Sequence, residues 1–133
     1  MTTTRTARCS CGQLSISCSG EPFRVSICHC LACQRRTGSV FGAQARFREE
    51  QIDTVSGISR VYERVADSGN VVRFHFCPKC GGTVHYAIDD TPGVIAVPVG
   101  NFADPGFPQP RFSVYEARRH GWVQVPQDCD HLP

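Results

Sequence analysis

Nine cysteines among 133 residues, most of them in close groups, limit what this chain can fold into more than any other feature. The groups are Cys9 and Cys11, then Cys28, Cys30 and Cys33, then Cys77 and Cys80. Such groups form either disulfides or metal sites. The odd number of cysteines and the lack of an apolar leader at the start of the sequence favour metal, because the cytosol keeps thiols reduced. We therefore expect a cytoplasmic protein that binds zinc rather than one held by disulfides.

The two outer pairs can form one closed site. Cys9 and Cys11 are two positions apart, so on extended backbone their side chains point the same way. Cys77 and Cys80 have CxxC spacing, and the two glycines after them let the backbone turn and direct N–H groups at the sulfurs. Four thiolates are the closed ligand set of a structural zinc. The alternative for FCPKCGG is a thioredoxin-like redox motif, but here a strand pattern follows the glycines rather than a helix.

The middle group, in ICHCLACQRRTG, supplies three thiolates and no obvious fourth ligand. Cys28 and Cys30 share a face at a strand end, while His29 points away. Cys33 returns from the first turn of a short helix that should end near Gly38. Three protein ligands with an exchangeable fourth are typical of a catalytic or ligand-accepting zinc. Because three thiolates leave the centre negative, it suits binding and deprotonating a thiol better than making hydroxide, and we predict these cysteines to be catalytic.

Arginines follow the middle group directly. Arg35 and Arg36 are predicted to bind the carboxylates of a thiol substrate, with Arg46 as a further candidate. For each arginine alone, a solvated helix or strand surface is an equally good interpretation.

One histidine and the two remaining cysteines are interpreted without a role in metal binding or catalysis. His75 shares a strand face with Cys77 but is interpreted as a histidine with an ordinary hydrogen bond. Cys18 lies on an apolar strand face and is predicted to be a core thiol. Cys129, near the end of the sequence, is predicted to be a bystander.

Short strands separated by Gly, Pro, Asn and Asp predict a mostly β domain with little helix. Alternating apolar residues indicate strands at 13–19 and 23–30, joined as a hairpin by the turn SGEP. The remaining predicted segments are strands at 41–47, 59–65, 71–76, 83–88 and 94–100, an irregular loop at 101–112 and an extended edge at 113–123. The length fits one domain over 1–133, with its core at about 8–122 and a loose tail from Pro126.

The charge gives little support to nucleic-acid binding. The formal net charge is +2, and zinc-bound thiolates would remove that positive balance. No apolar run is long enough to span a bilayer, so we expect no membrane partner either. The sequence does not determine the oligomeric state.

The order CSCG, CHCLACQRRTG, FCPKCGG over about residues 8–122 resembles the glutathione-dependent formaldehyde-activating enzyme family, which shares its domain with centromere protein V. The resemblance implies a β-tent fold of packed antiparallel sheets, a structural zinc on the outer cysteine pairs and a second zinc on the middle group. It also implies addition of glutathione to formaldehyde, and members are classed as carbon–sulfur lyases. Many relatives carry a histidine where our alignment places Ser113, which implies a different thiol or aldehyde here.

Two functions from different classes follow. The leading one is a zinc-dependent enzyme of carbon–sulfur lyase type that adds a glutathione-like thiol to a small aldehyde such as formaldehyde, or catalyses the reverse. The alternative is a non-catalytic zinc-binding module that binds glutathione or a protein partner. An accessible fourth position at the three-cysteine group distinguishes the first from the second. Chromatin association, suggested by the centromere relative, ranks last because the chain has no basic tail.

Overall fold

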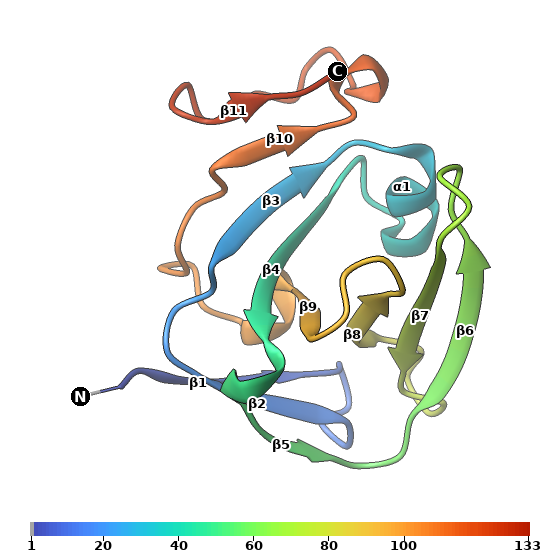
Figure 1. The fold of residues 1–133 in the computed structure, drawn as a ribbon, viewed down its shortest axis with the longest axis vertical. Coiled ribbons are helices and arrows are strands. Elements are labelled where there is room, and N and C mark those ends of the chain that lie inside the picture. Colours follow the sequence, from blue (N-terminus) through green and yellow to red (C-terminus); the bar gives the residue numbers. More distant parts are fainter. Residues whose placement is uncertain (1) are drawn as a thin grey trace.

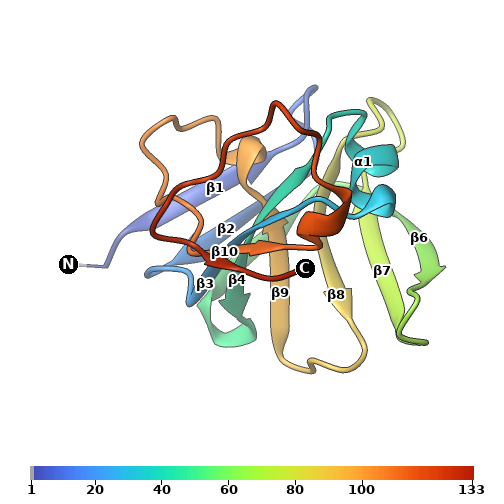
Figure 2. The same ribbon diagram turned by 90° about the horizontal axis from the view of Figure 1, so that it is seen from above.

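The computed structural model describes residues 2–133, whose strands form two β-sheets (Figures 1 and 2). The smaller sheet has the order β1 (Thr4–Arg8), β2 (Ser15–Ser19), β5 (Ile52–Ser56). The larger sheet has the order β11 (Asp130–His131), β10 (Phe112–Val114), β3 (Arg24–Cys28), β4 (Gly42–Arg48), β9 (Val94–Pro98), β8 (Thr83–Ile88), β7 (Val71–Phe76), β6 (Arg60–Val65). Within the described residues, α1 (Leu31–Thr37) is the one α-helix, and 3-10 turns occur at Glu49–Gln51, Val99–Phe102 and Glu116–Arg118. The prediction of a mostly β, β-tent fold with two packed sheets is confirmed, except that β10 pairs in parallel with β3 and β11 rather than antiparallel.

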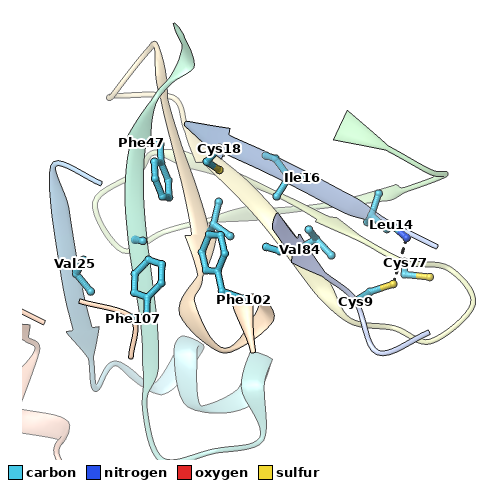
Figure 3. Close-up of a cluster of buried hydrophobic side chains, with 13 residues drawn as sticks. Cys9, Leu14, Ile16, Cys18, Val25, Phe47, Cys77, Val84, Phe102 and Phe107 are labelled. Atoms are coloured by element: carbon cyan, nitrogen blue, oxygen red, sulfur yellow. Dashed lines mark hydrogen bonds between the residues drawn. The ribbon is translucent and has the colours of Figure 1, made fainter. Parts of the chain in front are cut away.

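The core lies between the two sheets. Ile16 and Cys18 of β2 face Phe47 of β4, as Figure 3 shows, and all three are almost fully buried. Alternating burial along β2 is what an amphipathic strand produces, and it confirms Cys18 as a core thiol. Cys9 and Cys77 belong to this core and close one end of it, so the outer cysteine pairs are continuous with the apolar packing.

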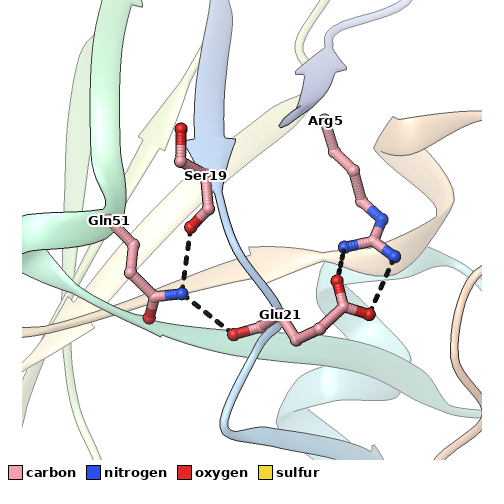
Figure 4. Close-up of polar contacts among 4 residues, drawn as sticks. All are labelled: Arg5, Ser19, Glu21 and Gln51. Atoms are coloured by element: carbon pink, nitrogen blue, oxygen red, sulfur yellow. Dashed lines mark hydrogen bonds and ion pairs between the residues drawn. The ribbon is translucent and has the colours of Figure 1, made fainter. Parts of the chain in front are cut away.

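The predicted hairpin between β2 and β3 is wrong, because the two strands belong to different sheets. β2 pairs with β1 and β5, whereas β3 pairs with β4 and β10. The turn at Gly20 is instead a crossing between sheets. The side-chain amide of Gln51 donates to the carbonyls of Ser19 and Glu21, at 3.0 and 2.9 Å, and Arg5 forms an ion pair with Glu21 (Figure 4). These contacts come from distant segments, which a local turn pattern does not reveal.

The predicted loose tail is also wrong. β11 pairs in parallel with β10, and the Asp130 amide donates to the Arg111 carbonyl at 2.8 Å. Cys129 is buried, and its thiol donates to the Pro110 carbonyl at 3.0 Å. It belongs to neither cysteine cluster, which agrees with its prediction as a bystander. The strand is only two residues long, too short for any sequence period to indicate it. The assignment of the chain to a single domain stays a prediction.

Other elements differ in smaller ways. The strands predicted at 41–47, 59–65, 71–76, 83–88 and 94–100 are confirmed as β4, β6, β7, β8 and β9. Sequence analysis missed β1 and β5, whose residues are mostly exposed or half-buried and so lack a clear apolar stripe. The expected extended edge at 113–123 is shorter than predicted, because a 3-10 turn follows β10 directly.

Gly57, just after β5, should tolerate no side chain. Its φ is +99°, and a Cβ there would lie 1.9 Å from the Gln13 carbonyl oxygen. Gly69 is the matched control, because its φ is +90° and a Cβ there would meet open space. We expect Gly57→Ala to lower the free energy of unfolding by at least about 2 kcal/mol more than Gly69→Ala, since both carry the left-handed backbone penalty but only one adds the overlap. Urea unfolding followed by circular dichroism measures the difference. Equal losses of unfolding free energy in the two variants would contradict the close contact between position 57 and the Gln13 carbonyl.

Candidate metal centres

The four outer cysteines come together where the β1–β2 turn meets the β7–β8 turn. Their sulfurs, on Cys9, Cys11, Cys77 and Cys80, all lie within 4.8 Å of one another. Cys11 Sγ lies 3.7 Å from both Cys9 Sγ and Cys77 Sγ. A tetrahedral zinc with Zn–S bonds of about 2.3 Å separates its sulfurs by about 3.8 Å. The cluster therefore has the dimensions and the donor set that hold such an ion.

Backbone N–H groups point at these sulfurs. The amides of Lys79 and Cys80 donate to Cys77 Sγ at 3.4 and 3.5 Å, and the Leu14 amide donates to Cys9 Sγ at 3.3 Å. Desolvation opposes the thiolate form of Cys77, yet the donors around its sulfur prevail and lower the pKa of Cys77 to about 6. The turn thus favours thiolate, which is the form that binds metal.

Gln13 connects this cluster to the rest of the fold. Its side-chain amide nitrogen lies 3.0 Å from Cys77 Sγ and 2.6 Å from the Ile58 carbonyl oxygen, while its oxygen accepts from the Ile58 amide at 3.0 Å. The side chain therefore connects three segments: the β1–β2 turn, the β5–β6 connection and the CxxC turn. Sequence analysis missed it, because a glutamine two residues after a cysteine carries no distinctive pattern.

The middle cysteines come together at the start of α1. The sulfurs of Cys28, Cys30 and Cys33 lie within 4.8 Å of one another. Cys30 is the N-cap of α1, and its sulfur accepts from the Cys33 amide at 3.3 Å. At the other end Gly38 is left-handed, with φ of 70°, so the helix ends where the sequence predicts. The geometry matches the expected convergence of three sulfurs from a strand end and a first helical turn.

Close packing of α1 on β4 fixes this arrangement. A Cβ at Gly42 would lie 3.4 Å from Cys33 Cβ and 3.2 Å from Arg36 Nη2. The helix therefore rests directly on the β4 backbone, opposite Cys28 in the strand register.

Charge in the three-cysteine group concentrates on one sulfur. The thiols of Cys28 and Cys33 donate to Cys30, which lowers the pKa of Cys30 to about 2. The pKa of Cys28 is raised, because its thiol donates to the neighbouring sulfurs and is buried. These shifts favour the thiolate form on Cys30 over the other two sulfurs.

No fourth cysteine, histidine or carboxylate of residues 2–133 joins the three sulfurs. His29 lies between two of them in sequence but is fully buried elsewhere, with Nε2 3.0 Å from Ser113 Oγ, as the strand phase predicts. Burial lowers the pKa of His29, which favours its neutral form. Ser113 therefore contacts His29 rather than the cysteines.

A cavity of about 510 Å³ lies beside the three-cysteine group, between α1 and strands β6, β7 and β8. Its lining is Ala32, Arg35, Arg36, Tyr62, Arg64, Phe74, Phe76, Gly81 and Thr83. None of the three cysteines lines the cavity, but Ala32 precedes Cys33 on α1, and Arg36 packs against Gly42 next to Cys33. The lining combines guanidinium groups with aromatic rings, which suits a ligand that has both anionic and apolar parts.

The arginines predicted to bind substrate differ in whether they line the cavity. Arg35 and Arg36 line the cavity, whereas Arg46 does not. Arg46 lies on β4 with Arg24 and Ala96 as its strand partners. Arg64 of β6 lines the cavity and was missed, because strand β6 is remote from the cysteine motif in sequence.

Two buried polar atoms on α1 and β4 have no partner in the described part of the chain. They are Arg36 Nη2, whose residue lines the cavity, and Gln44 Oε1, whose residue does not. Gln44 lies two residues after Gly42 on β4, so it faces the same side as the helix contact. A buried donor and a buried acceptor without partners are costly, and a bound molecule is one way to satisfy them.

The other histidines do not approach either cluster as ligands. His75 Nδ1 lies 3.2 Å from Ser59 Oγ, and its ring stacks on His85 at 4.4 Å. The interpretation of His75 as an ordinary hydrogen-bonded histidine is confirmed. The helices within residues 2–133 are all too short or too polar to cross a bilayer.

A model of the glutathione-dependent formaldehyde-activating enzyme family matches residues 4–118. The chain belongs to this family. A search of curated proteins gave no significant match. Among solved structures the chain resembles a Rhodobacter sphaeroides protein, with 22% identity and a TM-score of 0.57 over 76% of this chain and 88% of that one. At that identity the likeness concerns the fold alone. The family association with formaldehyde and glutathione fits the presence of two cysteine clusters that could bind zinc.

Gln13→Ala should weaken metal binding at the four-cysteine cluster. The substitution removes the N–H donor to Cys77 Sγ and frees the Ile58 backbone. Outer-shell partners of metal ligands contribute about 10–100-fold to affinity, and we expect a loss in that range. Competition with a zinc chelator measures it, and Gln109→Ala, which removes only contacts to exposed Asp128, is the control. Unchanged affinity would show that the hydrogen bond has no role in metal binding.

The two clusters should differ in what their loss does to folding. We expect two zinc ions per chain by elemental analysis. Cys33→Ser should remove one zinc and leave the circular dichroism spectrum unchanged, because α1 is peripheral to the main core. Cys80→Ser should remove the other zinc and lower the free energy of unfolding by more than about 3 kcal/mol, because metal binding there is coupled to folding. Equal destabilisation by both variants would contradict this division.

Proposed function

We propose that this protein is a cytoplasmic, zinc-dependent enzyme of carbon–sulfur lyase type. Its reaction joins a glutathione-like thiol to a small aldehyde such as formaldehyde, or runs in reverse. In the forward direction a carbon–sulfur bond forms at the aldehyde carbon, and the thiol proton ends on the former carbonyl oxygen. The observation that carries this proposal is the three-cysteine group at the edge of a cavity with arginine and aromatic lining.

The cysteines divide into two roles in this proposal. Cys9, Cys11, Cys77 and Cys80 hold a structural zinc that closes one end of the core. Cys28, Cys30 and Cys33 hold a second zinc with an exchangeable fourth ligand. Zinc bound there supplies the charge that keeps a substrate thiol in its nucleophilic thiolate form.

The arginines bind and orient the thiol substrate. Arg36 Nη2 is a buried donor in need of an acceptor, and a substrate carboxylate meets that need. Arg35 lines the cavity beside it, one residue earlier on α1. The aromatic side chains, Tyr62, Phe74 and Phe76, exclude water from one wall of the cavity. Bound in this way, the substrate would present its thiol toward the three cysteines at the start of α1.

One observation favours a second function, a non-catalytic zinc-binding module. None of the residues that line the cavity, in the part of the chain the structure describes, is an aspartate, glutamate or histidine. The cavity therefore offers no carboxylate or imidazole to take or return a proton at neutral pH. A module that binds glutathione without chemical change needs no such group.

The deciding experiment measures binding and rate on the same zinc-loaded protein. Calorimetry follows glutathione binding, and NMR with ¹³C-formaldehyde follows adduct formation against the uncatalysed reaction. We expect saturable binding and acceleration of about 100-fold or more, in the range that positioning and activation of reactants supply. Cys33→Ser should abolish the acceleration, whereas Cys129→Ser, which keeps a hydrogen bond to Pro110, should not.

Each other result has a definite meaning. Binding without acceleration would support the module and exclude the enzyme. Two zinc ions whose surroundings no thiol changes would exclude both thiol-dependent functions.

A further inference from the structure

Charge in the cavity has one sign. Three arginines line it, Arg35 and Arg36 from α1 and Arg64 from β6, and no acidic residue of the described chain does. The nearest acid in sequence is Glu63, but alternation along β6 directs it to the opposite face of the sheet, where it lies 3.7 Å from Arg73. The guanidinium charge in the cavity is therefore not balanced by the lining.

The guanidinium groups converge on one aromatic ring. Arg36 Cζ lies 5.4 Å from the Phe74 ring centroid, and Arg64 Cζ lies 5.6 Å from it. Arg36 Cζ is also 5.4 Å from the Tyr86 centroid. These cation–π contacts draw two arginines from different elements toward the same wall of the cavity. Among the described residues, neither arginine forms an ion pair, and Arg36 Nη2 is buried without an acceptor.

The size of the cavity indicates whether its positive charge acts on the thiol or on the aldehyde. About 510 Å³ is within the roughly 300–1,000 Å³ range of sites for whole small molecules. A one-carbon aldehyde fills little of that volume and carries no charge. The positive lining therefore acts on the thiol reactant.

We propose, on the basis of the proposed function, that the cavity selects thiols that carry two or more anionic groups and no ammonium group. Glutathione satisfies only the first condition. Its amino group is cationic at neutral pH, and the cavity offers that cation guanidinium neighbours and no carboxylate. A thiol of the same shape without the ammonium charge retains both carboxylate contacts and loses the repulsion. Arg64 is then a specificity-determining residue, because it adds the third positive charge from outside the cysteine motif.

The test compares glutathione with N-acetylglutathione, which has the same thiol and carboxylates but a neutral amide in place of the ammonium. Titration calorimetry on the zinc-loaded protein gives the two dissociation constants at low ionic strength. We expect N-acetylglutathione to bind about tenfold more tightly, as removal of one like-charge contact near a protein surface predicts. The ratio should shrink at about 0.5 M salt, because salt screens partly exposed charges.

Two variants that each remove one positive charge show whether the preference between the two thiols depends on Arg64. Arg64→Gln should reduce the ratio of the two dissociation constants to about threefold, since a lost charge weakens the repulsion. Arg111→Gln is the matched control, because Arg111 lies at the β10 end of the sheet in an exposed pair with Asp128, and it should leave the ratio unchanged. Circular dichroism and zinc content show that both variants remain folded and loaded.

The outcomes separate this inference from the proposed function. Equal affinity for the two thiols, or tighter binding of glutathione, overturns the inference and leaves the proposed function standing. Equal shifts in Arg64→Gln and Arg111→Gln also overturn it, because the effect would then reflect net charge alone. Failure of both thiols to bind removes the thiol site itself, and with it the proposed function.

Discussion

The junction of two turns at the four-cysteine cluster is the constraint on which the fold depends most. Cys9 and Cys77 are buried in the main core, whereas Cys11 and Cys80 reach the surface, so the cluster seals the end of the space between the sheets. Neighbouring sulfurs lie 3.7 Å apart, and four thiolates at that spacing repel one another unless a cation sits among them. A cation bound there would both allow the cluster to form as thiolates and link segments 66 residues apart.

The three-cysteine group depends on a different support. α1 has only seven residues, too few for a helix that is stable alone. It is held by its contact with Gly42 and by the C-terminal segment, whose Arg118 carbonyl and His120 ring both bond to Gln34. His29, between two of the cysteines, is fixed in the same way by Ser113. The C-terminal segment thus orders the cysteines without contributing a ligand position to the group.

The features that were predicted correctly from the sequence depend on residues that are close together in the chain. Close cysteine spacing identifies both clusters, and alternating apolar residues identify strands such as β4, β7 and β8. The errors concern contacts that are remote in the sequence. The turn at Gly20 looks the same in a hairpin and in a crossing between sheets, and only Gln51 and Arg5, from other segments, decide between them. Arg64 was missed for the same reason, since strand pairing alone brings β6 to the cavity.

The opposite charges of the cysteine group and the cavity lining explain why they lie together. Arg64 lowers the pKa of Cys30, after the larger effects of the neighbouring thiols, so the cavity arginines also stabilise the thiolate. Arginine keeps its charge at any physiological pH, whereas lysine in a partly buried site loses its proton more readily. A fixed positive field can therefore favour thiolates in the cysteine group and attract an anionic ligand to the cavity at once. An acidic group in this lining would weaken both effects, which accounts physically for a cavity lined by arginines and aromatic rings.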